Sequence, residues 1–402
     1  MLGIFNTRKK DAPVMEDLFG GDRDKVLARH IVLNKIKPLD GEGIWCAGSE
    51  HVRAVIIGSD SLSLNIARQM ALVCHYPNFE DDKGYHRTVI TIVSHRAGGR
   101  DDVDALRKHF EAITGNLLPE CVWRCSYYGT DTTEWSSSKT ESFIDLEFEF
   151  VGLGNNDVNT FITDKLDTES ESVVSVIDNS DELSEETVSW IQRHCHQYCH
   201  LNDYKHDDEV KDNAVDVRRA QVVNMLYEAS CHLEDVYPSD LYKVVAYKTA
   251  LESFCLHTSA GKRQSYWNKI NGVPLKVSSL CCADFIDTKI RSVKAGGCDM
   301  NHLNGPELER FARSEHARWN VEKLISGFRP YTLQERYADE RLFSDPLALR
   351  KERKRMKTEM HAHIDICSCN ELIRVDFESY KYDCFLTLAA DDIIRICPNI
   401  IL

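Results

Sequence analysis

The stretch VRAVIIGSDSLSLNIARQMALVCHY, residues 52 to 76, decides the fold. Its first seven residues form an apolar, β-branched run that ends in Gly58, which is typical of a buried strand followed by a tight turn. Small or apolar side chains then recur at helical spacing, at Leu64, Ala67, Met70, Ala71 and Cys74. The stretch therefore predicts a strand, a turn and a helix.

The same alternation continues to about residue 200. A second strand is expected at 87–93, followed by a helix from 101 whose first turn is acidic, as helix N-termini favour. Further strands are expected at 121–128, 143–151 and 172–178, helices at 157–166 and 184–200, and a polar loop at 129–142. Strands that alternate with helices predict an α/β fold with a doubly wound, mostly parallel, Rossmann-like sheet.

A clearly bounded helix opens the last part of the chain. Asn304 can cap it, Pro306 fits its first turn, and Gly327 can end it in a left-handed conformation. A length of 402 residues suits two domains. With a boundary at the small-residue stretch 295–297, we expect an arm or packing extension at 1–45, a Rossmann-like domain at 46–298, and a small, mainly helical domain at 299–402.

Composition excludes some classes of function. The formal net charge of −15 opposes general binding to nucleic acid, and no apolar run reaches the roughly 20 residues of a membrane helix. The first residues lack the apolar stretch of a secretory signal, and the odd count of 15 cysteines favours reduced thiols, so we expect a cytoplasmic protein. The basic run at 350–357 is either a local anion site or, more commonly, a solvated loop.

The turn after the first strand is an eroded dinucleotide fingerprint. The glycines of G-x-G-x-x-G fall on Gly58, Asp60 and Ser63, and the Asp60 carboxylate would repel a pyrophosphate. After the second strand, Arg96 and Ser94 could hold a phosphate, or that segment could be a plain surface loop. The candidate cofactor-binding residues are Gly58, Ser59, Asp60, Ser94, His95 and Arg96, with an NAD(P)-like ligand as the open alternative to none.

In the order and spacing of its elements, this region resembles the NAD-binding (TrkA-N) regulatory domain of bacterial potassium-uptake systems. The resemblance covers residues 52 to 96 and implies a nucleotide at the switch point of the sheet that shifts the conformation of a partner. It therefore implies sensing more than hydride transfer, and it supplies no catalytic residue.

Two further signals point less clearly to chemistry. In HCHQYCH, residues 194 to 200, His196 with His200 and Cys195 with Cys199 would be i,i+4 pairs on a helix, a spacing that can hold zinc. Without a second ligand cluster we favour an amphipathic helix end and assign no metal site. The common catalytic motifs of hydrolases, P-loop enzymes and zinc enzymes are absent, so an enzyme is the minority hypothesis.

The stretch SEHARWNVEKLISGFRPY, residues 314 to 331, resembles the signature helix of the domain named after ryanodine receptors, the RyR domain. The resemblance extends over about the last hundred residues, through Lys357, His361 and His363 to Asp383 before an apolar C-terminal helix. Ala362 and His363 replace the Pro-Cys of the family, Cys367 replaces an aromatic residue, and the loop at 331–356 is unusually long. The resemblance implies binding of an adenine nucleotide.

Helical spacing places Glu315, Trp319 and Glu322 on nearly one face, where an indole could stack on a nucleotide base. Alternatively, Trp319 fills the core of the small domain, as most helix tryptophans do. The candidate ligand-binding residues are Glu315, His316, Arg318, Trp319, Glu322, Arg329, Lys357, His361 and His363.

We therefore expect a sensor of a nucleotide or nucleotide-derived messenger, in which binding changes conformation or assembly, of a kind that suits stress or antiviral signalling. A homo-oligomer or an effector partner is expected with it. The alternatives are an NAD(P)- or nucleotide-processing enzyme and an inert scaffold.

Overall fold

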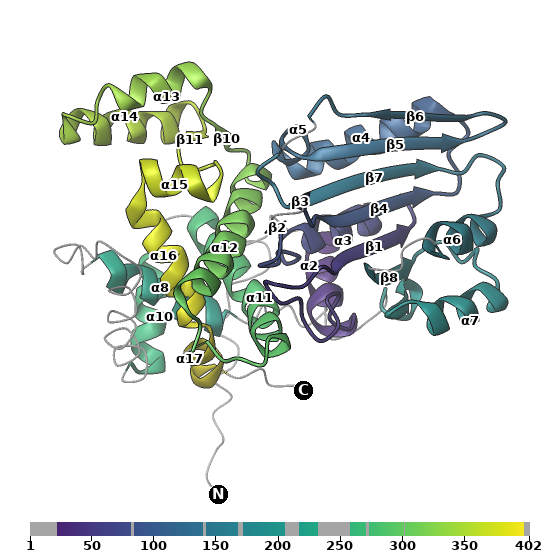
Figure 1. The fold of residues 1–402 in the computed structure, drawn as a ribbon, viewed down its shortest axis with the longest axis horizontal. Coiled ribbons are helices and arrows are strands. Elements are labelled where there is room, and N and C mark those ends of the chain that lie inside the picture. Colours follow the sequence, from purple (N-terminus) through teal and green to yellow (C-terminus); the bar gives the residue numbers. More distant parts are fainter. Residues whose placement is uncertain are drawn as a thin grey trace, which may run out of the picture.

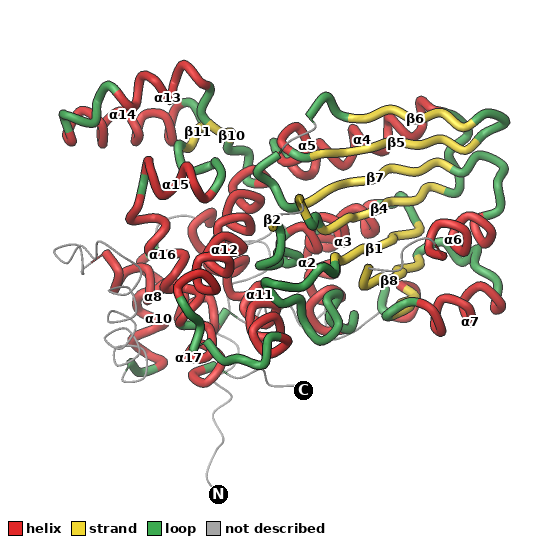
Figure 2. Tube along the Cα trace, in the orientation of Figure 1, coloured by secondary structure: helices red, strands yellow, loops and turns green. Residues whose placement is uncertain are grey.

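A parallel sheet forms one half of the molecule, and helices form the other half (Figure 2). The computed structural model describes residues 22–81, 84–139, 142–167, 172–205, 217–231, 258–270, 273–300 and 302–397. Among the described helices, none is both long enough and apolar enough to cross a membrane. The cysteines whose side chains the structure describes are free thiols.

The sheet has seven strands in the order β6-β5-β7-β4-β1-β8-β9. Its parallel centre follows the Rossmann order and consists of β7 (Leu146–Gly152), β4 (Thr88–Ser94), β1 (His51–Ile57), β8 (Ser172–Asp178) and β9 (Gln197–His200). Beyond β7 lie the parallel strand β5 (Val122–Tyr128) and the antiparallel edge strand β6 (Thr132–Ser136). The prediction of an α/β fold with a mostly parallel sheet is confirmed. The polar loop predicted at 129–142 was wrong in part, because β6 lies within it.

Helices cover both faces of this sheet, which explains why its central strands are apolar on both sides. The helices α3 (Ser61–Ala71) and α4 (Arg100–Thr114) share one hydrophobic core with the strand residues Ala54, Ile56 and Ile90. The opposite core joins Val55 and Ile57 to α6 (Val158–Asp167) and α7 (Glu185–His194). Within the predicted N-terminal arm, α2 (Arg23–His30) and the π-helical turn η2 (Ile31–Lys35) pack on α3 and enter the first core.

The helix predicted at 184–200 was wrong in its second half. The helix α7 ends at His194, Cys195 adopts an extended conformation, and the chain continues as β9, which pairs with β8. The i,i+4 spacing of His196 and His200 on a helix is therefore lost. His196 Nε2 instead lies 2.9 Å from the carbonyl oxygen of Pro38.

The helical half is built around a second core. It joins α8 (Arg218–Cys231), α10 (Ala260–Lys269) and α11 (Val273–Ala295) to α12 (Gly305–Ile325), α15 (Cys369–Val375), α16 (Phe377–Leu388) and α17 (Ala390–Ile396). Helices on both sides of residue 298 thus share one core. Two ion pairs fix α11 to the first part of the chain, Arg29 with Asp284 at 2.6 Å and Arg291 with Asp40 at 2.8 Å.

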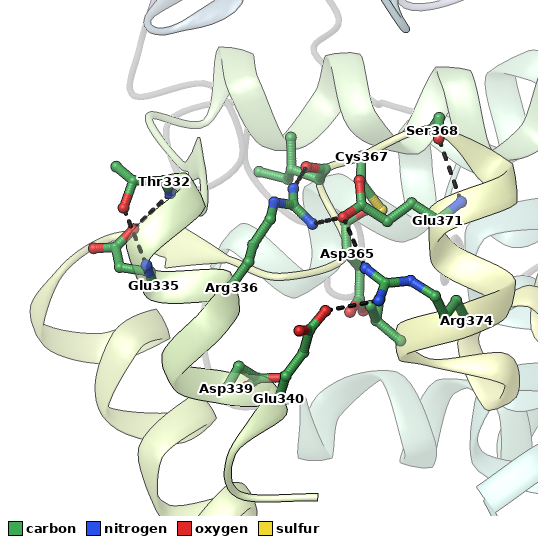
Figure 3. A network of polar contacts seen from close by, with 12 residues as sticks. Thr332, Glu335, Arg336, Asp339, Glu340, Asp365, Cys367, Ser368, Glu371 and Arg374 are labelled. Carbon is green, nitrogen blue, oxygen red and sulfur yellow. Dashed lines mark hydrogen bonds and ion pairs between the residues drawn. The ribbon is translucent and has the colours of Figure 1, made fainter.

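A helical hairpin stands at the edge of this half (Figure 1). It consists of α13 (Leu333–Glu340) and α14 (Pro346–Glu359), so the long loop expected at 331–356 is mostly helical. The short strands β10 (Arg329–Pro330) and β11 (Ala362–His363) pair in parallel at its base. Figure 3 shows two ion pairs that attach α13 to α15, Arg336 with Glu371 and Arg374 with Glu340.

Candidate ligand-binding site

The site is built on α12, whose ends are those predicted from the sequence. The Asn304 side chain accepts from the amide of Glu307, the Glu307 carboxylate accepts from the amide of Asn304, and Pro306 lies in the first turn. Gly327 follows the last turn with φ +86, a left-handed value that glycine adopts without steric cost. These boundaries fix which side chains α12 turns inward.

Three charged side chains of α12, Glu315, Arg318 and Glu322, lie in the interior, which differs from the predicted arrangement. Glu315 is fully buried and forms ion pairs with Lys289 of α11 and with Arg318, whose Nε lies 2.8 Å away. Burial alone would raise the pKa of Glu315, but Arg318 and Lys289 together hold that pKa below its usual value. Glu315 and Arg318 are therefore paired with each other in the interior, although the buried Nη1 of Arg318 has no hydrogen-bond partner among the described residues.

Glu322 and His316 are buried on the same helix. Glu322 accepts from Ser278 Oγ at 2.8 Å and forms an ion pair with Lys323 at 3.1 Å. His316 Nε2 donates to the carbonyl oxygen of Cys367 at 3.1 Å, and its Nδ1 lies 3.3 Å from the Asp383 carboxylate. These contacts hold α12 to α11, to α16 and to the segment before α15.

Trp319, in contrast to Glu315, His316 and Glu322, is only half-buried. The His363 ring meets the indole edge-on, with centroids 5.0 Å apart and planes at 82°. The His316 ring lies nearly parallel to the indole at 5.9 Å, and Lys323 Nζ lies 5.5 Å from the indole centroid. Trp319 is thus partly open and has a cation beside it.

His363 connects this indole to the base of the hairpin. Its ring is buried, and it also contacts Phe328, whose centroid lies 6.2 Å away. Burial lowers the pKa of His363 well below its usual value, and the positive charges of Lys357, Lys323 and Arg353 lower the pKa further. His363 is therefore neutral at neutral pH, in part because cations from α12 and α14 lie close to it.

Asp365 is a buried carboxylate that lies close to the positive charges of Lys357 and Arg353. Its Oδ2 accepts from Ser379 Oγ at 3.2 Å, whereas its buried Oδ1 has no hydrogen-bond partner. Burial and the nearby Asp376 carboxylate raise the pKa of Asp365 to about 6. Phe328 belongs to the sequence stretch that resembles the RyR signature, whereas Asp365, Lys323 and Arg353 were not selected from the sequence, because charged residues within one segment usually form a solvated surface.

The remaining predicted ligand residues differ in their surroundings. Arg329 is occupied by a two-fold hydrogen bond to Glu335, at 2.8 Å for each nitrogen, which holds the pKa of Glu335 at about 2. His361 is exposed, has φ +46, and lies against Phe328 with centroids 5.9 Å apart. Lys357 is exposed on α14. The structure therefore brings together Trp319, His316, His363, His361 and Lys357 and leaves Arg329 engaged elsewhere.

The eroded dinucleotide turn is filled by the protein itself. Gly58 has φ +144, and a Cβ there would lie 2.7 Å from Ser63 Oγ. Asp60 caps α3 by accepting from the amide of Ser63 at 2.9 Å, and Asn179 Nδ2 donates to the Asp60 carboxylate at 2.8 Å. The helix N-terminus that binds phosphate in a dinucleotide fold is thus capped by a carboxylate.

The three candidate residues at the end of β4, Ser94, His95 and Arg96, lie beside this turn. Ser94 Oγ is 3.4 Å from Ser59 Oγ, and Arg96 Nε donates to His95 Nε2 at 3.0 Å. Partial burial and the Arg96 charge lower the pKa of His95. Arg96 is exposed and forms no ion pair within the described residues, so a contact from it to an anion stays a prediction.

The two candidate sites lie at opposite ends of the sheet. The parallel strands point away from the helical half (Figure 1). Gly58 and Ser94 follow or end two of these strands, so they lie at the end of the sheet that is far from the helical half. The end of α12 instead contacts the turn between α4 and α5 (Leu117–Glu120), where Asn116 Nδ2 donates to the carbonyl oxygens of Gly327 and Phe328 at 2.8 and 3.0 Å. A single small ligand cannot touch both sites.

The chain matches no family model, no curated protein and no solved structure. The resemblances to the RyR and TrkA-N domains therefore stay predictions from the sequence.

Proposed function

We propose that this protein is a sensor that binds a nucleotide or a nucleotide-derived messenger at Trp319, and that binding changes its conformation or assembly. The supporting observation is a half-buried indole with Lys323 beside it and the neutral His363 at its edge. An exposed indole face stacks on a purine with about 1 to 3 kcal/mol. Lysine ammonium groups attract the phosphates of the same molecule.

The ligand lies, in this proposal, between α12 and the base of the hairpin. Lys323 comes from α12, Lys357 from α14, and His363 from β11. A phosphate held between two such elements has a higher affinity for the arrangement in which the two lysines are close. Binding therefore shifts the population toward that arrangement, which is the thermodynamic basis of a sensor.

The capped turn at Asp60 weighs against a conventional NAD(P)-dependent enzyme. Its carboxylate occupies the first turn of α3 and would repel a pyrophosphate there. No arrangement in the described residues favours a particular reaction, so we carry the enzyme alternative no further.

The test is to identify small molecules released from the purified protein by denaturation, using mass spectrometry. We expect a nucleotide from the natural protein, less of it from Trp319→Phe, and none from Trp319→Ala. Trp135→Ala is the matched control, because Trp135 is also half-buried and has a cation beside it, Arg100 at 4.6 Å from its ring centroid, but lies on the edge strand β6. Equal occupancy in the natural protein and Trp319→Ala, with both folded by circular dichroism, would rule out the proposal.

A further inference from the structure

The exposed side of the α13–α14 hairpin combines apolar and basic side chains. Leu347 is 83% exposed, Leu333 65%, Tyr337 52% and Phe343 45%, and no other part of the described chain has so many large exposed apolar residues. Scattered single residues of this kind are ordinary, but a group on one projecting element marks an interaction surface.

The cations on the same hairpin are also exposed. Arg341, Arg350, Lys351 and Lys354 form no ion pair with any described residue. The acidic residues of the hairpin are largely engaged, since Asp339 binds Arg353 at 2.7 Å and Glu352 binds Arg355 at 2.6 Å. The outward side of α14 is therefore locally positive on a chain whose formal net charge is −15. We call these four cations with the four apolar side chains the hairpin surface.

An acidic surface lies at the other end of the molecule. Asp181, Glu182, Glu185 and Glu186 are exposed at the start of α7, next to the half-buried Leu183 and Trp190. Glu185 and Glu186 form no ion pair with any described residue. Figure 1 shows α7 and the hairpin at opposite ends of the long axis. We call this group the α7 surface.

We propose that the hairpin surface of one copy docks on the α7 surface of a second copy of this chain, so that molecules assemble head to tail. Local charge complementarity supports this occupant, because the exposed cations of the hairpin surface match the exposed carboxylates Glu185 and Glu186, and neither group is ion-paired among the described residues. The two surfaces are different, so the contact is heterologous and adds copies in an open chain or a ring.

This assembly goes beyond nucleotide sensing and requires no ligand. The two properties can nevertheless be connected, because α14 carries Lys351 and Lys354 of the hairpin surface and also Lys357 of the candidate site. A ligand that draws in Lys357 would move the hairpin surface with it.

The test is a charge-reversal exchange, followed by sedimentation velocity of ligand-free protein at low and high salt. One variant carries Lys351→Glu with Lys354→Glu, and the other carries Glu185→Lys with Glu186→Lys. We expect the natural protein to form oligomers that grow with concentration and dissociate in about 0.5 M salt, since exposed charges are screened within a few ångströms there. Each variant alone stays monomeric. An equimolar mixture recovers assembly, because each reversed end then meets an end of opposite charge.

The control variant carries Lys108→Glu with Lys294→Glu, two exposed lysines outside both surfaces, and assembles like the natural protein. A natural protein that is monomeric at every concentration, or oligomers that persist in either variant, would overturn the proposal. Cosedimentation of a monomeric natural protein with phosphatidylserine vesicles would overturn it in favour of a membrane surface. Loss of nucleotide in Trp319→Ala without loss of assembly would show that the two proposals stand or fall separately.

Discussion

The imidazole of His363 meets the indole of Trp319 edge-on, with ring centroids 5.0 Å apart and planes at 82°. This contact joins the middle of α12 to β11 at the base of the hairpin. A ligand that stacks on the indole must therefore lie close to a neutral imidazole, whose Nδ1 already accepts from the backbone amide of Asp365 at 3.2 Å.

Substitution of Lys357 should weaken binding of the phosphate groups of a nucleotide without changing binding of its base. We expect Lys357→Met to weaken binding of ADP about tenfold, because it removes one charge-assisted contact, and to leave binding of adenosine unchanged. Isothermal titration calorimetry measures both. Lys354→Met is the matched control on the same helix, and an equal loss in that variant would place the phosphate elsewhere.

The stability of the fold should depend on the ion pairs that Glu315 forms with Lys289 of α11 and Arg318 of α12. Glu315→Gln leaves Lys289 and Arg318 buried without their counter-charge, so we expect a loss of about 3 to 5 kcal/mol in the free energy of unfolding. Urea denaturation measures this loss. Glu359→Gln, at an exposed position of α14, should change stability by less than about 0.5 kcal/mol. A small effect of Glu315→Gln would mean that water reaches these cations.

Asp365 should make stability depend on pH in an unusual direction. Its pKa in the folded protein is about 6, above the value near 4 of an unfolded chain, so the folded state holds the proton more strongly between these values. The contribution of Asp365 to stability therefore falls as the pH rises from about 4 to about 6, by on the order of 2 kcal/mol. Asp365→Asn removes this dependence.

The measurement is the difference in unfolding free energy between the natural protein and Asp365→Asn, at pH 4.5 and at pH 7. We expect the variant to gain relative to the natural protein at the higher pH. The same difference at both pH values would show that Asp365 titrates normally.

The turn at Gly58 should not tolerate a side chain. Its φ of +144 is rarely adopted by other residues, and a Cβ would lie 3.0 Å from the Cβ of Asn179. We expect Gly58→Ala to destabilise the protein by about 1 to 3 kcal/mol. Gly99→Ala is the control, because that glycine has an extended backbone and open space around its Cβ position. Thermal unfolding of the two variants gives the comparison, and equal midpoints would contradict the strain argument.

The sequence predicts the centre of the sheet well and its edges poorly. The strands β1 and β4 are apolar on both faces because helices cover both faces, and such runs are visible without a structure. The strands β6 and β9 lie at the two edges of the sheet, where exposed side chains are tolerated and the pairing comes from a neighbouring strand. A polar stretch such as 132–136 therefore looks like a loop.

The candidate site was only half predictable for a related reason. Trp319 and His363 could be selected by residue type and by resemblance, but the burial of Glu315 depends on Lys289, which another helix supplies. Alternating charges on a single helix usually indicate a solvated face, and nothing local to 314–322 shows that partners cover it. The roles of Lys323 and Asp365 depend on distances between elements, which spacing along the chain does not determine.

The buried ion pairs of Glu315 and the contact of Glu322 with Ser278 also limit how far α12 can move. A shift of α12 by one turn would separate Glu315 from Lys289 and pull Glu322 from Ser278, at a cost larger than a single stacked base supplies. If a ligand binds beside Trp319, a movement of the hairpin should cost less than a movement of α12, because the ion pair of Arg374 with Glu340 is partly open to water.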